Sequence, residues 1–197
     1  MGRKSLALLI GLILTVAISS LHDFSARCAD IRDNTLRLHV LANSNSREDQ
    51  TLKLYVRDAL IVHTAGLTQT CTDRDEAEAQ FAVCLGQIEQ IARAALQERG
   101  CDDPVRVEIT NMFFPTRMYE SATLPAGRYD AVRVTLGAGA GQNWWCVMFP
   151  PMCLPAAMDH GDSALEEQIR MLSEAPCYEI KFAVVELYET IRDSLRS

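Results

Sequence analysis

The stretch YDAVRVTLGAGAGQNWWCVMF, residues 129–149, carries the strongest strand signals of the chain. Val132, Val134 and Leu136 alternate with other residues, a pattern typical of a half-buried strand. A second strand is predicted over 144–149, and the glycine-rich connection at 137–141 favours a hairpin between the two. A phosphate-binding loop is excluded there, because no Gly-Lys-Ser/Thr ends the glycine run and a strand rather than a helix follows it.

Outward from this pair, the same alternation predicts strands over 35–41 and 104–114. Helical spacing and capping residues predict helices over 46–64, 73–100, 163–173 and 179–195. The last helix is expected to bury a stripe made of Ile180, Val184, Leu187, Ile191 and Leu195. The order of the elements predicts an α+β fold, in which helices cover one face of a mainly antiparallel sheet of about four strands.

The N-terminus has the pattern of a targeting segment. Arg3 and Lys4 precede an apolar run over 6–18, which is shorter than the roughly 20 residues of a membrane span. We therefore expect a signal peptide over 1–19 with cleavage before Ser20, and the alternative is an uncleaved anchor. A polar lead-in without clear period over 20–34 and a single domain over 35–197 complete the predicted organisation.

Composition limits the class of partner. The chain has 197 residues, of which 48% are hydrophobic, and its formal net charge is -7. Without Arg3 and Lys4, 17 basic side chains stand against 26 acidic ones. An acidic domain is poorly suited to nucleic acid and to anionic lipid, so the membrane is expected to matter only through export or an anchor. A protein or small-molecule partner is the better expectation.

Seven cysteines are present, so at least one stays a free thiol or pairs between chains. Cys146 and Cys153 flank a Pro-Pro corner, and we predict a disulfide between them. The alternative makes Cys146 a nucleophile with a histidine as its base, but no family signature of such an enzyme is present. No motif for a metal or a cofactor occurs either, and a non-enzyme is expected.

Trp144 and Trp145 are adjacent, so a strand directs them to opposite faces of the sheet. One can enter the core. The other must meet solvent, a covering helix or a partner, and tryptophan is enriched at binding hot spots.

Three segments carry a family resemblance. They are LHVLANS (38–44) with the helix start that follows it, LPAGRYDA (124–131) and GQNWWCVMFPPMC (141–153). They resemble, in order, segments of the stage II sporulation protein R family, and the match runs over roughly residues 35–155.

The resemblance implies a protein that is made in the forespore and exported into the space between forespore and mother cell. There it would activate a membrane-embedded aspartic protease of the mother cell, which processes the sigma-E precursor. It implies that this chain is an activator and that the catalytic aspartic dyad belongs to its partner. The rival readings are an exported thiol-dependent or wall-active enzyme, and a structural protein of the intermembrane space. The candidate partner contacts are Asn43, Arg128, Tyr129, Asn143, Trp144 and Trp145.

Overall fold

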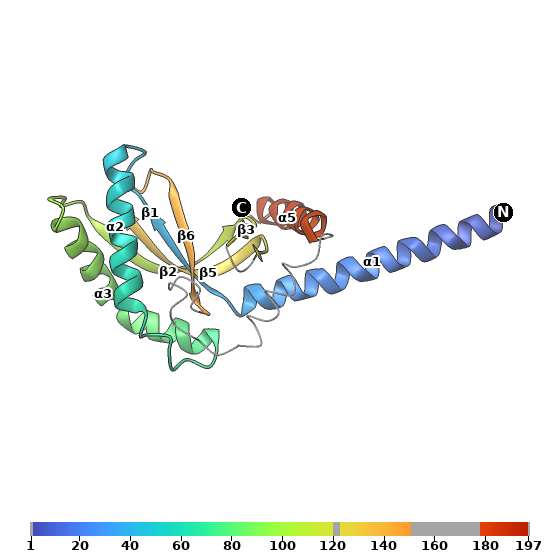
Figure 1. Cartoon of the computed structure of the whole chain (residues 1–197), viewed down its shortest axis with the longest axis horizontal. Coiled ribbons are helices and arrows are strands. Elements are labelled where there is room, and N and C mark those ends of the chain that lie inside the picture. Colours follow the sequence, from blue (N-terminus) through green and yellow to red (C-terminus); the bar gives the residue numbers. More distant parts are fainter. Residues whose placement is uncertain (1, 120–122, 151–177, 197) are drawn as a thin grey trace. The chain divides into compact units, whose positions relative to one another are not determined.

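The computed structural model describes residues 2–119, 123–150 and 178–196 (Figure 1). The chain divides into two compact units. Unit 1 comprises Met1–Arg32, Phe114–Gly127 and Ala164–Ser197, and unit 2 comprises Asp33–Phe113 and Arg128–Ser163. The predicted single domain over 35–197 stays a prediction, and the helix predicted over 163–173 lies outside the described residues.

A four-stranded sheet organises unit 2. Its strands are β1 (Leu36–Leu41), β2 (Val105–Phe114), β5 (Gly127–Leu136) and β6 (Asn143–Phe149), in the order β2-β5-β1-β6. β1 pairs with β5 in parallel and with β6 in antiparallel orientation. The amide of Gly137 donates to the carbonyl of Pro104, so the end of β5 lies beside the start of β2. The predicted α+β fold with a mostly antiparallel sheet is confirmed.

The predicted hairpin between the strands at 129–136 and 144–149 is wrong. β1 lies between β5 and β6 and pairs with both. The glycine-rich connection instead crosses the end of β1, where Ala140 and Gly141 donate their amides to the carbonyls of Asn43 and Ala42 at 3.0 and 2.9 Å. Alternation predicts each strand by itself but not its neighbour, because a distant strand can insert between two that are close in sequence.

Helices α2 (Arg47–Thr64) and α3 (Arg74–Gln97) lie together on one face of this sheet (Figure 1). Their ends follow the sequence signals: the side chains of Ser46 and Asp73 accept from the amides of Asp49 and Glu76. The shared core takes alternate residues of the strands and the inner helix faces, among them Leu36, Leu38, Val40, Val132, Val134, Cys146, Leu52, Val56, Leu60, Phe81 and Ile88.

Unit 1 contains helix α1 (Arg3–Asp33), the short pair β3 (Arg117–Met118) and β4 (Thr123–Leu124), and helix α5 (Tyr178–Ser194). The segment 20–34, in which the sequence showed no clear period, is helical in the structure, because α1 continues to Asp33. Phe24, Cys28 and Ile31 recur at helical spacing and are buried, which explains why the helix persists. α1 is long and apolar enough to cross a membrane, a property that signal sequences and anchors share.

Helix α5 is correctly predicted, but its buried face is not. Val184, Leu187, Ile191 and Leu195 are exposed, and the side chain of Ile180 lies outside the described residues. The buried residues are Phe182, Val185 and Glu189. Phe182 packs on the ring of Phe24 at 5.0 Å, and Glu189 pairs with Arg32 at 3.2 Å. Specific contacts with α1 therefore decide the orientation of α5, and a periodic apolar stripe alone could not reveal them.

Candidate functional site

Asn43 joins two loops at one end of the sheet. Its Oδ1 accepts from the amide of Ala138 at 2.8 Å, and its Nδ2 donates to Asp49 at 3.3 Å. A Cβ on Gly137, whose φ is +55°, would lie 2.3 Å from Asn43 Oδ1. A Cβ on Gly141 would lie 2.2 Å from the carbonyl oxygen of Ser44. The glycines of the GAGAG segment thus permit a close approach of two backbones, with Asn43 between them.

Lys53 of α2 also contacts these loops. It was not among the candidate residues identified from the sequence. Its ammonium donates to Gln50 Oε1 at 2.7 Å and to the carbonyl of Gln142 at 3.1 Å. The side chain is only 5% exposed, and burial, followed by the nearby charge of Arg57, lowers its pKa. A lysine at a buried position of α2's apolar stripe was the available signal, because an amphipathic helix rarely buries an ammonium without a partner.

The two tryptophans of β6 take opposite faces, as predicted, and both are half-buried. Trp144 packs against the core, and the guanidinium of Arg57 lies 5.2 Å from the centroid of its ring. Trp145 lies on the other face, with its ring 6.2 Å from that of His39. Neither ring stands fully exposed. Their predicted role as partner contacts stays a prediction.

Asn143 is exposed beside a buried histidine. Its Oδ1 lies 2.7 Å from Nε2 of His39, which is 2% exposed. Burial lowers the pKa of His39, and the charges of Arg133 and Arg37 lower it further, against the opposing effect of the Asn143 hydrogen bond. His39 is therefore a neutral structural group near pH 7.

Arg128 and Tyr129 lie at the opposite end of the sheet from Asn43 and Asn143, since Leu36 is level with Asp130 and Leu41 with Asn143. Arg128 is exposed and donates to the side chain and the carbonyl of Asn111 at 2.8 and 2.7 Å. Tyr129 is 1% exposed, and the guanidinium of Arg37 lies 5.0 Å from its ring centroid. The predicted contacts therefore form two separate groups rather than one site.

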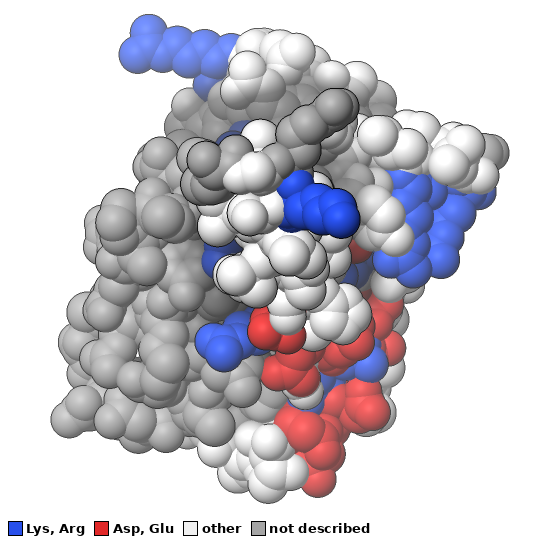
Figure 2. All heavy atoms as spheres, turned by 90° about the vertical axis from the view of Figure 1, so that its right-hand side faces the viewer, with Lys and Arg blue, Asp and Glu red and all other residues white. Residues whose placement is uncertain are grey.

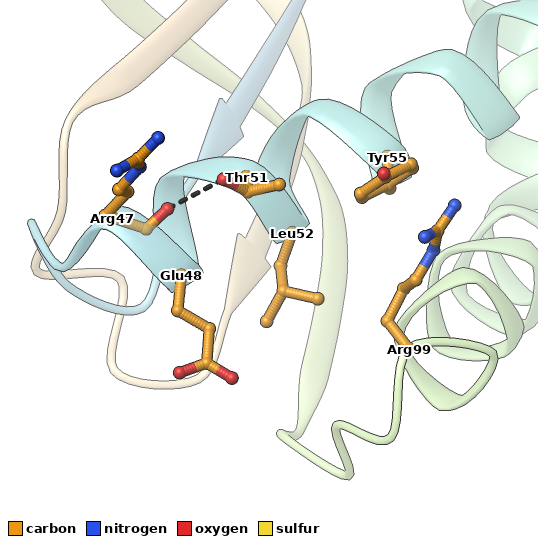
Figure 3. A pocket seen from close by; sticks show the side chains of 6 residues that line it. All are labelled: Arg47, Glu48, Thr51, Leu52, Tyr55 and Arg99. Carbon is orange, nitrogen blue, oxygen red and sulfur yellow. Dashed lines mark hydrogen bonds between the residues drawn. The ribbon is translucent and has the colours of Figure 1, made fainter.

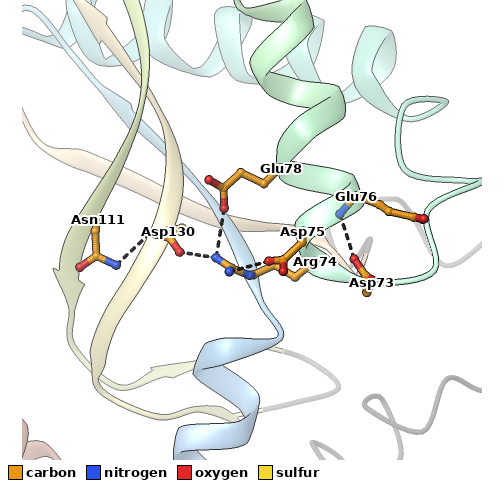
Figure 4. A network of polar contacts seen from close by, with 7 residues as sticks. All are labelled: Asp73, Arg74, Asp75, Glu76, Glu78, Asn111 and Asp130. Carbon is orange, nitrogen blue, oxygen red and sulfur yellow. Dashed lines mark hydrogen bonds and ion pairs between the residues drawn. The ribbon is translucent and has the colours of Figure 1, made fainter.

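A polar network links α3 to the sheet (Figure 4). Arg74 pairs with Asp130 of β5 and with Glu78 and Asp75 of its own helix. Asp130 also accepts from Asn111 at 2.8 Å. The network occupies the N-terminal end of α3, so it fixes this helix to the end of the sheet where Arg128 lies. Sequence reasoning identified Arg128 there but not Arg74.

The LPAG segment of unit 1 surrounds Arg32. Arg32 donates to the carbonyl of Ala126 at 3.2 Å and pairs with Glu189, with 9% and 7% of the two charged side chains exposed. Gly127 has a φ of +147°, and a Cβ there would lie 2.4 Å from Cδ of Arg32. The glycine is thus required by the packing of an arginine, a role that the turn pattern in the sequence could not show.

An open pocket of about 520 Å³ lies between α2 and the turn that follows α3 (Figure 3). It combines an apolar floor with charged side chains, and its lining consists of Arg47, Glu48, Thr51, Leu52, Tyr55 and Arg99. No local sequence pattern indicates this pocket, because Arg99 approaches α2 only after the chain has passed through α3.

The described cysteines comprise one disulfide-bonded residue and four free thiols. Cys146 is disulfide-bonded, whereas Cys28, Cys71, Cys84 and Cys101 are free. Burial raises the pKa of Cys71 and of Cys101, which disfavours their thiolates. The predicted partner, Cys153, lies outside the described residues, so that pairing stays a prediction.

The described residues contain no cluster of three or more His, Cys, Asp or Glu side chains that could hold a metal ion. On the face drawn in Figure 2, acidic and basic side chains both occur among the described residues.

Comparison with known proteins gives the family. The family model for stage II sporulation protein R matches residues 32–159. Stage II sporulation protein R of Bacillus subtilis (strain 168) is 35% identical over 144 residues, which are 73% of this chain and 64% of that relative. The match thus spans just under two thirds of the relative's length. No solved structure matches. On both comparisons, the chain belongs to the stage II sporulation protein R family.

Proposed function

We propose that this chain is an exported signal that activates a membrane-embedded aspartic protease of the mother cell and so causes processing of the sigma-E precursor. Membership of the stage II sporulation protein R family is the observation that carries the proposal, because it ties the chain to sporulation. The forespore would secrete it into the intermembrane space.

The apolar N-terminal helix supports export. Its segment from Leu6 to Ile18 is exposed throughout, as expected of a segment that meets a translocation channel or a lipid bilayer rather than a protein core. The contacts of α1 with α5 begin at Ser20, where Lys181 donates to Oγ at 2.9 Å. Cleavage before Ser20 would therefore leave the packing of α5 on Phe24 and Arg32 in place.

Activation by binding needs a difference in affinity. A ligand shifts a protease between inactive and active states only if it binds the active state more tightly, and a tenfold difference corresponds to about 1.4 kcal/mol. A folded domain with fixed loop junctions suits this role, because contacts that are already ordered lose little entropy on binding.

A thiol enzyme is the less favoured reading. The sulfur of Cys146 is held in a disulfide, and a disulfide sulfur has no thiolate for nucleophilic attack. Cys146 is also 5% exposed and belongs to the core cluster, which restricts a substrate's access.

The test is reconstitution in a non-sporulating host. The candidate protease and the sigma-E precursor are co-expressed with and without this chain, and the precursor's size is followed by immunoblot. The proposal predicts processing only when the chain is present. Absence of processing, with every component shown to be present and correctly located, would contradict it.

A Cys146→Ser variant in the same assay distinguishes a structural disulfide from a catalytic thiol. Loss of the disulfide is expected to lower stability by roughly 2–5 kcal/mol, as is usual for a native bridge. Activation should then persist at a temperature where the variant is folded. A variant that is folded at that temperature but wholly inactive would favour a catalytic thiol.

A further inference from the structure

The pocket between α2 and the end of α3 has a lining suited to recognition. Glu48, Thr51, Leu52 and Tyr55 follow one face of α2 at helical spacing, and Arg99 approaches from the turn after α3 (Figure 3). Leu52 is a buried part of the lining, whereas Tyr55 is 39% exposed. The pocket therefore offers an apolar surface directly beside a cation.

Arg99 is held in a geometry that leaves its donors available. Its guanidinium carbon lies 3.5 Å from the centroid of the Tyr55 ring, so the flat face of the guanidinium is stacked. The N–H groups of a guanidinium lie in its plane, and stacking leaves them directed outward in the fork that matches a carboxylate.

Arg47 of α2 and Arg99, in the turn after α3, differ from other arginines of these two helices. Arg57, Arg74 and Arg93 each pair with a carboxylate of their own helix. Within the described residues, neither Arg47 nor Arg99 takes part in such an ion pair. In a chain with a net charge of -7, two unpaired cations beside one pocket are a local excess of positive charge.

We infer that this pocket receives an acidic segment of the protein partner. A carboxylate of the partner would meet the guanidinium of Arg99, and a neighbouring apolar side chain would contact Leu52 and Tyr55. The inference rests on the proposed function for the identity of that partner, the protease. Tyrosine and arginine dominate binding hot spots, and a stacked arginine loses little conformational freedom when it binds.

Glu48 restricts what the pocket accepts. Its carboxylate lines the same pocket, and in Figure 3 it points away from the guanidinium of Arg99. A polyanion or an anionic lipid surface would be repelled by this carboxylate and by the net acidic chain. A single carboxylate beside an apolar side chain avoids that repulsion, and a protein segment supplies this combination.

Charge reversal of the full chain tests the pocket in the reconstituted host. Arg99→Glu is compared with Arg93→Glu, which changes the net charge equally but lies on α3 outside the pocket lining. The measured quantity is the amount of exported chain that gives half-maximal processing. We expect an increase of about tenfold or more for Arg99→Glu, the usual effect of losing a charge-assisted hydrogen bond, and no change for Arg93→Glu. Equal effects of the two substitutions, or none, would overturn the inference.

Photo-crosslinking tests the pocket without depending on activation or on a charge change. A benzoylphenylalanine is placed at Thr51 in the pocket, or at Val83, an apolar position of α3 that is 85% exposed. The expected product joins Thr51, but not Val83, to a protease peptide that contains Asp or Glu. Crosslinks to lipid, to a second copy of this chain or to nothing would overturn the inference.

The two experiments separate this inference from the proposed function. Crosslinking at Thr51 without any processing would leave the pocket as a docking site and reject activation. Processing that is unaffected by Arg99→Glu and lacks the crosslink would retain activation and reject the pocket.

Discussion

At the scale of single residues, several residues of the family-like segments pack against other parts of the chain or form hydrogen bonds within it. Asn43 bonds the glycine-rich connection, and Gly127 makes room for Arg32. Tyr129 is buried beneath Arg37. These residues would therefore affect a partner mainly by holding loops in place, whereas Arg128, Asn143 and the pocket residues other than Leu52 retain exposed surface.

Replacing Asn43 tests its role between the loops. Asn43→Ala leaves the amide of Ala138 and the carboxylate of Asp49 without this partner. We expect the free energy of unfolding in urea to fall by about 0.5–1.5 kcal/mol, the net contribution of a typical hydrogen bond, because water can reach the exposed amide of Ala138. Asn45→Ala, at an exposed position of the same loop, is the control and should change it by less than about 0.5 kcal/mol. Equal effects of the two substitutions would refute the assigned role.

Buried His39 should make stability depend on pH. Because its pKa is lowered in the folded state, protonation favours the unfolded chain, so its contribution is present above the ordinary pKa of about 6.5 and declines below it. Each pH unit below that value can cost up to about 1.4 kcal/mol. Unfolding free energies at pH 7 and pH 5 should therefore differ less in His39→Gln than in the wild type. The exposed His63→Gln variant should behave as the wild type, and an unchanged pH dependence in His39→Gln would count against the assignment.

At the scale of elements, a buried ion pair connects two helices of unit 1. Arg32 of α1 and Glu189 of α5 are both nearly inaccessible, so removal of one charge leaves the other buried without it. Arg192 also approaches Glu189 at 3.5 Å, but from a more exposed position. The pairing should therefore determine how firmly α5 packs on α1.

Glu189→Gln tests this pairing. Breaking a buried pair typically costs roughly 3–5 kcal/mol, and the loss should appear as faster hydrogen exchange of the α5 amides. Glu186→Gln on the same helix is the matched control, and its exchange should remain close to that of the wild type. Unchanged protection of α5 in Glu189→Gln would show that the apolar contacts alone hold the helix.

The sequence predicts elements better than it predicts their neighbours. The caps at Ser46 and Asp73 act within four residues, so local sequence determines both helix starts. The pairing of β1 with both β5 and β6 joins residues about a hundred positions apart, and no local pattern encodes it. For the same reason the sequence could not predict the pocket or the polar network, because Arg99 meets Tyr55 and Arg74 meets Asp130 only after folding.

The face of α5 shows a second limit. Its apolar stripe has regular helical spacing, yet Leu187 and Ile191 are more than half exposed. Hydrophobic periodicity identifies an amphipathic helix, but a charged residue such as Glu189 can be buried when a partner satisfies it. Arg32 is that partner, and it lies in a segment that composition alone marks as polar.

At the scale of the whole molecule, the chain is acidic, belongs to the stage II sporulation protein R family, begins with an apolar helix compatible with the proposed export, and carries a pocket with unpaired arginines. The central claim is that the chain acts from outside the membrane on a partner that performs the chemistry. Activation should therefore depend on export. A chain that is made but not exported should cause no processing of the sigma-E precursor.

The most direct measurement is the processing of the sigma-E precursor by exported and retained forms of the chain. Leu9→Arg with Leu12→Arg interrupts the apolar run and should block export, whereas Leu9→Val with Leu12→Val keeps the run apolar and serves as the control. The account predicts processing with the wild type and with the valine variant, and none with the arginine variant despite equal amounts of protein. Processing by the retained form, or none by the exported form when the protease and the precursor are both present, would contradict it.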